Sequence, residues 1–77
     1  MDELIREILM EVERSENKFP FWPDDNIHAA AIVCEESGEL IRATIQHKYE
    51  NSAGYEMKTE AIHTAAMCIR FLKNIDK

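Results

Sequence analysis

Hydrophobic residues recur along this chain with the spacing of α-helices, in three separate segments. From Asp2 to Asn17 they form one stripe, made up of Leu4, Ile5, Ile8, Leu9 and Val12. Pro20 and Pro23 cannot continue this helix, because proline lacks a backbone N–H and clashes with the preceding turn. Runs of alternating β-branched residues, which are typical of strands, do not occur. The pattern therefore predicts an all-α protein.

A second helix is predicted from about residue 25 to residue 50, and it begins at one of three good N-cap residues, Asp24, Asp25 or Asn26. At about 100° per residue, its apolar residues gather on two sides. One side holds Ile32, Val33, Leu40 and Ala43, and the other holds Ala30, Cys34, Ile41 and Ile45. A helix that is apolar on two sides must be covered on two sides.

A third helix is predicted over about residues 56–75, after the polar stretch Asn51–Gly54. Apolar residues surround most of it: Ala61, Ile62, Ala65, Ala66, Cys68, Ile69 and Leu72. A chain of 77 residues rarely builds a sufficient core alone. We therefore expect one domain over residues 1–77, in which an antiparallel helical hairpin and a short N-terminal helix form a four-helix-bundle core by homo-oligomerisation, as a dimer or tetramer.

Composition excludes two classes of partner. Nine basic and fifteen acidic residues give a net charge of −6, which argues against a broad nucleic-acid surface. No apolar run approaches the roughly 20 residues of a membrane span, and the acidic, amphipathic start of the chain does not resemble a secretory signal. We expect a cytoplasmic protein. Cys34 and Cys68 lie in alanine-rich apolar runs without a CxxC partner, which predicts buried free thiols.

Carboxylates on the two long helices are the main candidates for chemistry. Glu36 and Glu39 are three residues apart, as are Glu60 and His63, so an antiparallel pairing can bring all four together. Grouped carboxylates bind hard divalent cations. We favour this interpretation over a solvated stripe for Glu36 and Glu39, because they stand among apolar residues where unpaired charge is costly to bury. Gly38 between them costs about 1 kcal/mol relative to alanine, which a close backbone or ligand approach would explain.

The segment Cys34–Leu40, CEESGEL, resembles the EExGEL signature of the MazG-like all-α nucleoside triphosphate pyrophosphohydrolases. The pattern of that family is ExxE followed by ExxD. Residues 36–39 match ExxE, and residues 60–63 lie where ExxD is expected. The resemblance covers about residues 22–72, two-thirds of the chain.

This resemblance implies metal-dependent hydrolysis of a nucleoside or deoxynucleoside triphosphate to the monophosphate and pyrophosphate. Glu36, Glu39, Glu60 and His63 would hold Mg²⁺, with Mn²⁺ as the alternative. His63 stands where the family has aspartate, and imidazole suits softer metals than Mg²⁺. Three outcomes stay open: His63 ligates a softer metal, three carboxylates hold Mg²⁺ without it, or the fold is kept and catalysis is lost.

The remaining roles have competing interpretations. Glu35 or Glu36 would orient or deprotonate the attacking water, although Glu35 taken alone favours a solvent-facing position. Four residues are candidates for binding the nucleotide: Trp22, Arg70, Lys48 and Lys58. For Trp22 we favour a plug at the first interhelical turn over base stacking, and a solvent-facing charge explains each of the three cations at least as well as a binding role.

Two other functions fit parts of the sequence. Glu60-Ala61-Ile62-His63 is also the Glu-x-x-His motif of ferritin-like di-iron bundles, for which a homodimer would supply the full ligand set. A chain that lacks one acidic ligand also fits a nucleotide-binding or helical interaction module without catalysis.

Overall fold

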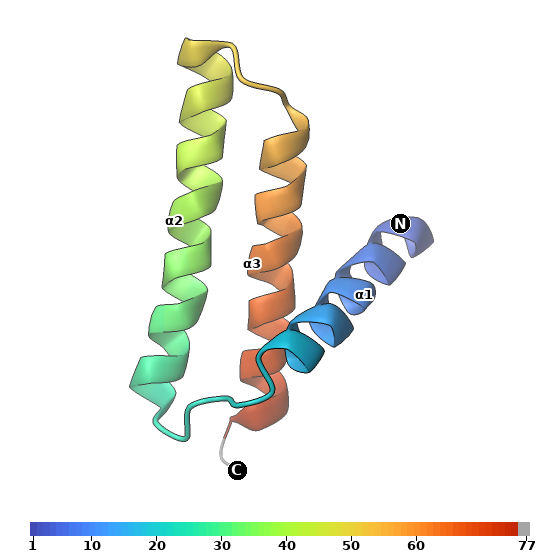
Figure 1. The fold of residues 1–77 in the computed structure, drawn as a ribbon, viewed down its shortest axis with the longest axis vertical. Coiled ribbons are helices and arrows are strands. Elements are labelled where there is room, and N and C mark those ends of the chain that lie inside the picture. Colours follow the sequence, from blue (N-terminus) through green and yellow to red (C-terminus); the bar gives the residue numbers. More distant parts are fainter. Residues whose placement is uncertain (76–77) are drawn as a thin grey trace.

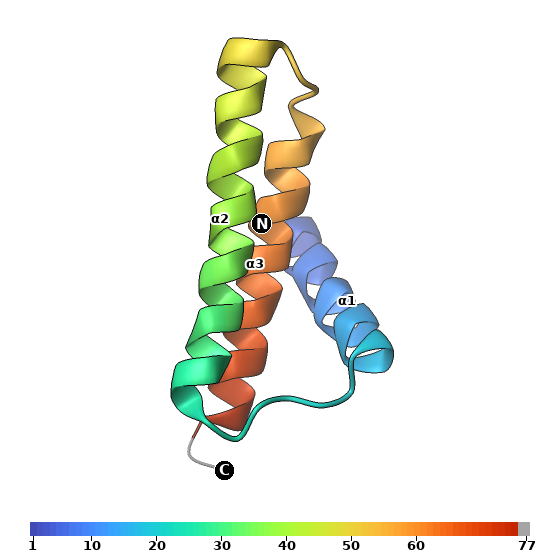
Figure 2. The ribbon, with the colours of Figure 1, turned by 60° about the vertical axis from the view of Figure 1, so that its left-hand side comes forward.

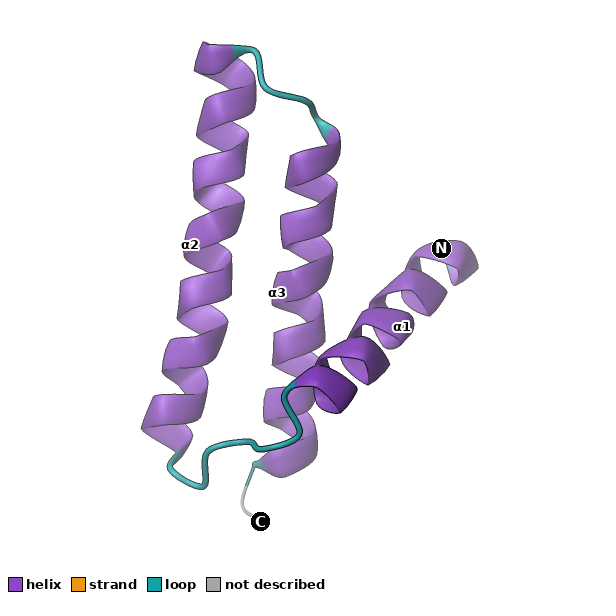
Figure 3. Ribbon diagram, viewed as in Figure 1, coloured by secondary structure: helices purple, strands orange, loops and turns teal. Residues whose placement is uncertain are grey.

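Three α-helices make up most of the protein in the computed structural model, which describes residues 1–75 (Figures 1 and 3). Helix α1 spans Asp2–Lys18, α2 spans Asn26–Glu50 and α3 spans Tyr55–Asn74. No strand occurs within these 75 residues. The predicted all-α fold is confirmed, and each helix begins and ends within one residue of the expected position.

Both ends of α2 are set by the residues that flank it. The Asp25 side chain accepts a hydrogen bond of 2.9 Å from the backbone N–H of Ile27, which satisfies a donor that the helix itself leaves unpaired. At the other end Asn51 adopts the left-handed conformation, with φ of 56°. His47 Nδ1 lies 2.7 Å from the Ser52 carbonyl oxygen. These local contacts end the helix and start the turn into α3.

Helices α2 and α3 run antiparallel side by side, and α1 crosses α3 obliquely on the flank away from α2 (Figures 1 and 2). Within the described residues the backbone of α1 approaches α3 closely but not that of α2. None of the three helices is long and apolar enough to cross a lipid bilayer, as far as residue 75.

The core lies where α1 and α2 both pack against α3. Val12, Ala66 and Met67 are buried there, and Ala66 has no exposed surface. Four half-buried residues pack around them: Trp22, Ile32, Val33 and Ile69. One of the two predicted apolar sides of α2 therefore faces α3.

The second apolar side of α2 is left uncovered by residues 1–75. Cys34 and Cys68 are both exposed, so the prediction of buried thiols is wrong for the single chain, because these positions lie outside the contact between α2 and α3. A Cβ atom at Gly38 would meet no other heavy atom within 4 Å. The expected close backbone approach at Gly38 is not made by this chain.

Two side chains of α3 fasten the end of α1: Lys73, which pairs with Glu16 at 2.7 Å, and Arg70. Arg70 is buried, and its Nη1 and Nη2 donate to the carbonyl oxygens of Ser15 (3.3 Å) and Phe19 (2.7 Å). Its guanidinium also lies 4.9 Å from the centroid of the Trp22 ring. The Ser15 carbonyl also accepts from the backbone N–H of Phe19 (2.8 Å), so Arg70 adds a second bond there. Its other bond goes to the carbonyl of Phe19, the residue that ends α1.

We expect Arg70→Met to lower the free energy of unfolding by about 2–3 kcal/mol, because it removes two charge-assisted hydrogen bonds and leaves the Phe19 carbonyl without its donor. Urea denaturation followed by circular dichroism measures this. Arg42→Met is the matched control, since Arg42 is exposed and pairs only with Glu39 at 3.4 Å. Equal stability losses in the two variants would contradict the anchoring role of Arg70.

Candidate functional site

Three side chains meet midway along the hairpin, and we call Glu36, Glu60 and His63 the hairpin cluster. His63 Nδ1 lies 3.6 Å from Glu60 Oε2 and 3.9 Å from Glu36 Oε2. One donor atom from each of the three residues lies within 4.8 Å of the others. Glu60 and His63 share a side of α3 because they are one turn apart, and Glu36 reaches them from α2. All three are half-buried.

The spacing of the hairpin cluster fits a single divalent cation. Two ligand atoms bound at about 2.1 Å to one octahedral ion lie about 3.0–4.2 Å apart. Both distances from His63 Nδ1 fall in this range. Two carboxylates and an imidazole form a mixed oxygen and nitrogen donor set, which suits Mn²⁺ or Fe²⁺ better than Mg²⁺.

Helix α1 adds a third carboxylate on the other side of the imidazole ring. Glu11 Oε2 lies 3.6 Å from His63 Nε2. Arg14 holds Glu11 with two hydrogen bonds, of 2.7 Å from Nε and 2.6 Å from Nη2. The sequence analysis did not select Glu11 or Arg14. Their only signal in the sequence is a spacing of three residues, which many surface ion pairs share.

The surroundings shift the pKa values of the two carboxyl groups that flank His63 in opposite directions. The hydrogen bond from Arg14 lowers the pKa of Glu11 below its usual value, and its effect exceeds that of burial. Burial raises the pKa of Glu36, and the neighbouring charges of Glu60, Glu35 and Glu39 add to the rise, while His63 opposes it. The negative charge of Glu36 is therefore costly in the folded chain.

Glu39 is a neighbour of the hairpin cluster but not one of its members. Its carboxylate is 3.4 Å from Arg42 Nη1, and it is about half exposed. Glu39 and Glu60 nevertheless line the same small hollow of about 180 Å³, together with Arg42. The two glutamates of the ExxE motif thus differ: Glu36 is one of the three grouped donors, and Glu39 is next to them.

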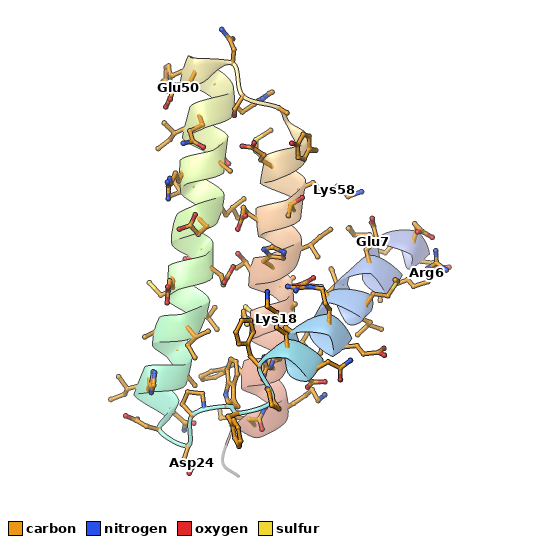
Figure 4. All side chains as sticks on the ribbon, in the orientation of Figure 1. Arg6, Glu7, Lys18, Asp24, Glu50 and Lys58 are labelled. Atoms are coloured by element: carbon orange, nitrogen blue, oxygen red, sulfur yellow. The ribbon has the colours of Figure 1, made fainter. Side chains whose placement is uncertain are left out.

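Glu35, Lys58 and Lys48, which are also predicted site residues, are not among the grouped donors. Glu35 is exposed on α2. Lys58 Nζ reaches from α3 towards α1, where it lies 3.3 Å from Glu7 Oε2 (Figure 4). Lys48 lies over the Tyr49 ring in the last turn of α2, twelve residues from Glu36 and so about 18 Å along the helix axis.

Trp22 and Arg70 have structural contacts that the sequence did not predict. The indole ring packs against the core and under the guanidinium of Arg70, whose Nη1 and Nη2 donate to carbonyls at the end of α1. A role for either residue in binding a nucleotide stays a prediction.

The raised pKa of Glu36 predicts a pH-dependent stability. The folded chain holds a proton on Glu36 more tightly than the unfolded chain, so the contribution of Glu36 to stability falls as pH rises above its usual value of 4.5. In metal-free buffer we expect Glu36→Gln to melt at a higher temperature than wild type at pH 7, and the difference to shrink below about pH 4. Glu50→Gln is the control, because Glu50 is exposed at the end of α2, and it should melt at the wild-type temperature at both pH values. A Tm difference for Glu36→Gln that stays the same at both pH values would contradict this account.

Comparisons with protein-family models, with curated proteins and with solved structures give no match.

Proposed function

We propose that this chain is a divalent-metal-dependent hydrolase that converts a nucleoside or deoxynucleoside triphosphate to the monophosphate and pyrophosphate. The observation that carries the proposal is the hairpin cluster: Glu36, from the CEESGEL segment, lies beside Glu60 and His63 of the second motif. The reaction class comes from the resemblance of these two motifs to the MazG-like family.

The donors of the hairpin cluster would hold the cation, and Glu39, which lines the same hollow as Glu60, is the candidate for a further ligand. Because His63 Nδ1 is among the donors, we favour Mn²⁺ over Mg²⁺ as the better activator. A divalent cation supplies two things when bound: it neutralises phosphate charge and lowers the pKa of a water molecule.

A carboxylate of this chain would act as the general base. The carboxylate oxygen takes a proton from water as that water attacks the α-phosphorus, and the bond from the α-phosphorus to the bridging oxygen breaks to release pyrophosphate. Glu35 neighbours Glu36 on α2 and is not one of the grouped donors. We therefore favour Glu35 as the base and Glu36 as a ligand.

A groove between α1 and α3 offers room for the nucleotide. It has a volume of about 460 Å³, and Met10 and Ile62 give it apolar walls, while Arg14 and His63 also line it. Volumes of this size are typical of small-molecule sites. Arg14 brings a cation near the hairpin cluster, and Lys58 lies against Glu7 in the groove wall (Figure 4). Both are suited to phosphate charge.

We expect the wild-type chain to release pyrophosphate from at least one nucleotide in a panel of canonical and modified triphosphates, faster with Mn²⁺ than with Mg²⁺. Glu60→Gln should lower the rate about 100-fold or more, because it removes a metal ligand. Glu50→Gln, at the exposed end of α2, should leave the rate unchanged. Product identification by chromatography distinguishes pyrophosphate from single-phosphate release.

Two results would contradict this function. An activity that is equal in wild type and Glu60→Gln would place the reaction elsewhere. The absence of hydrolysis across the panel, with nucleotide binding retained and activity gained by His63→Asp, would identify a binding module that has lost catalysis.

The donor set also favours a second candidate, a carboxylate-bridged iron site. Glu60 and His63 form a Glu-x-x-His pair on one helix, and Glu36 is the additional carboxylate from a neighbouring helix. Iron that co-purifies with the chain and is lost in Glu60→Gln would support this function. Nucleotide hydrolysis that depends on Mn²⁺ would count against it.

We also propose that two copies of the chain associate through the outer side of α2. A compact protein of 9.0 kDa exposes about 4,900 Å², whereas this chain exposes 5690 Å². The excess is close to the roughly 800 Å² that each partner buries in a standard interface. The radius of gyration, 13.4 Å, likewise exceeds the about 11.5 Å expected for 77 residues.

An apolar stripe on α2 is the surface that fits a second copy. Ile27, Cys34, Gly38, Ile41 and Ile45 follow one another at spacings of three, four or seven residues, and the large ones are exposed. Gly38 presents no side chain, and no atom of the described residues outside its own stretch of helix lies within 4 Å of the position of a Cβ there. A glycine at this position lets a second helix approach closely.

We expect Ile41→Glu to weaken self-association at least about tenfold, because the substitution buries an unpaired charge in the interface. Sedimentation equilibrium should give twice 9.0 kDa for wild type and a concentration-dependent lower mass for the variant. Leu9→Glu is the matched control, since Leu9 is an exposed apolar residue on α1, away from the stripe. A wild-type mass of 9.0 kDa at all concentrations would overturn the dimer.

A further inference from the structure

The two nitrogens of the His63 ring face different partners. Nδ1 lies towards Glu60 (3.6 Å) and Glu36 (3.9 Å), and Nε2 lies 3.6 Å from Glu11. A histidine that ligates a metal through one nitrogen commonly donates the other N–H to a carboxylate, which fixes both the proton and the ring orientation. Glu11 stands where that carboxylate is needed.

We propose that Glu11 is the positioning residue for His63: it accepts the Nε2 proton and so leaves Nδ1 unprotonated towards Glu36 and Glu60. This role rests on the proposed function, because it matters only if the hairpin cluster binds a cation. The present distance of 3.6 Å is longer than a hydrogen bond, so the two atoms must close to about 3.0 Å. Contacts of this kind often tighten when a site is loaded.

Glu11 is held in place far better than an ordinary helix-surface glutamate. The pair Glu3 and Arg6 has the same spacing on the same helix, yet it makes one contact of 3.0 Å and both side chains are about 70% exposed. Glu11 makes two hydrogen bonds to Arg14, and its side chain is only 13% exposed. Because the Glu11 carboxylate is fixed, it can hold the imidazole ring of His63 in one orientation, which a mobile carboxylate could not do.

Loss of Glu11 would shift the ring proton of His63 from Nε2 towards Nδ1. The nearest remaining carboxylates are those of Glu36 and Glu60, and both lie at Nδ1. A proton on Nδ1 removes the lone pair that a metal ion requires. The expected consequence is weaker metal binding, with the loss greater for Mn²⁺, which accepts imidazole readily, than for Mg²⁺.

Two measurements on Glu11→Met test the role of Glu11. Isothermal titration calorimetry should show Mn²⁺ affinity reduced about 10–100-fold, with a smaller change for Mg²⁺. Ring ¹⁵N shifts of His63, recorded without metal at about pH 8.5, where ordinary histidines are neutral, should show a larger share of the proton on Nε2 in wild type than in the variant. A merely structural role would not move that proton.

Three further variants make the outcome decisive. Glu11→Gln keeps an acceptor oxygen and should retain the Nε2 proton, which also separates this effect from misfolding. Glu13→Met, an exposed position on the same helix, should match wild type in both measurements. Glu60→Gln should lose Mn²⁺ binding as a direct ligand.

The failures of the two proposals are distinguishable. If wild type binds Mn²⁺ and Glu11→Met matches it in affinity and in proton position, the positioning role is overturned and the proposed function stands. If wild type binds neither Mn²⁺ nor Mg²⁺, the proposed metal function is overturned, and the role of Glu11 falls with it.

Discussion

Ala66 is completely buried on α3, where side chains from α1 and α2 close over it from different directions. A methyl group occupies little space, so both neighbours can approach the same point of α3. His63 is one turn earlier on this helix, and it therefore lies between Glu11 of α1 and Glu36 of α2. The geometry of the site depends on this packing, because a larger residue at position 66 would move one of the flanking carboxylates away from the imidazole.

The charges around His63 show how a small domain keeps acidic groups together. Arg14 compensates Glu11 directly, and the two make a stable pair at the edge of the groove. Among residues 1–75 no Lys or Arg pairs with Glu36, and burial makes its charge costly. A site that is strained by its own negative charge gains most from a cation, since binding relieves both repulsion and desolvation. In the proposed function, two of the three carboxylates beside His63 therefore have different tasks: Glu11 would orient the ring, and Glu36 would ligate the cation.

Helix α2 separates the proposed chemistry from the proposed assembly. Glu36 faces α3, whereas Gly38 and Ile41 lie on the opposite, uncovered side. A second copy that packs on the uncovered side would therefore complete the core and leave the groove between α1 and α3 open to a ligand. Packing of this kind would also cover Cys34, which is exposed on the outer side of α2 in the single chain.

The sequence by itself determined the three helices, their ends and the pairing of Glu60 with His63, because these follow from helical periodicity, capping and a spacing of one turn. Only the tertiary structure decided that Glu36, and not Glu39, is grouped with them, and that Glu11 joins from α1. The first choice depends on how α2 packs on α3, and the second on how α1 crosses α3. That crossing is fixed by contacts such as Arg70 to the carbonyls of residues 15 and 19, which are 55 and 51 positions away. The spacing of residues within one helix carries no information about contacts between residues more than 50 positions apart in the sequence.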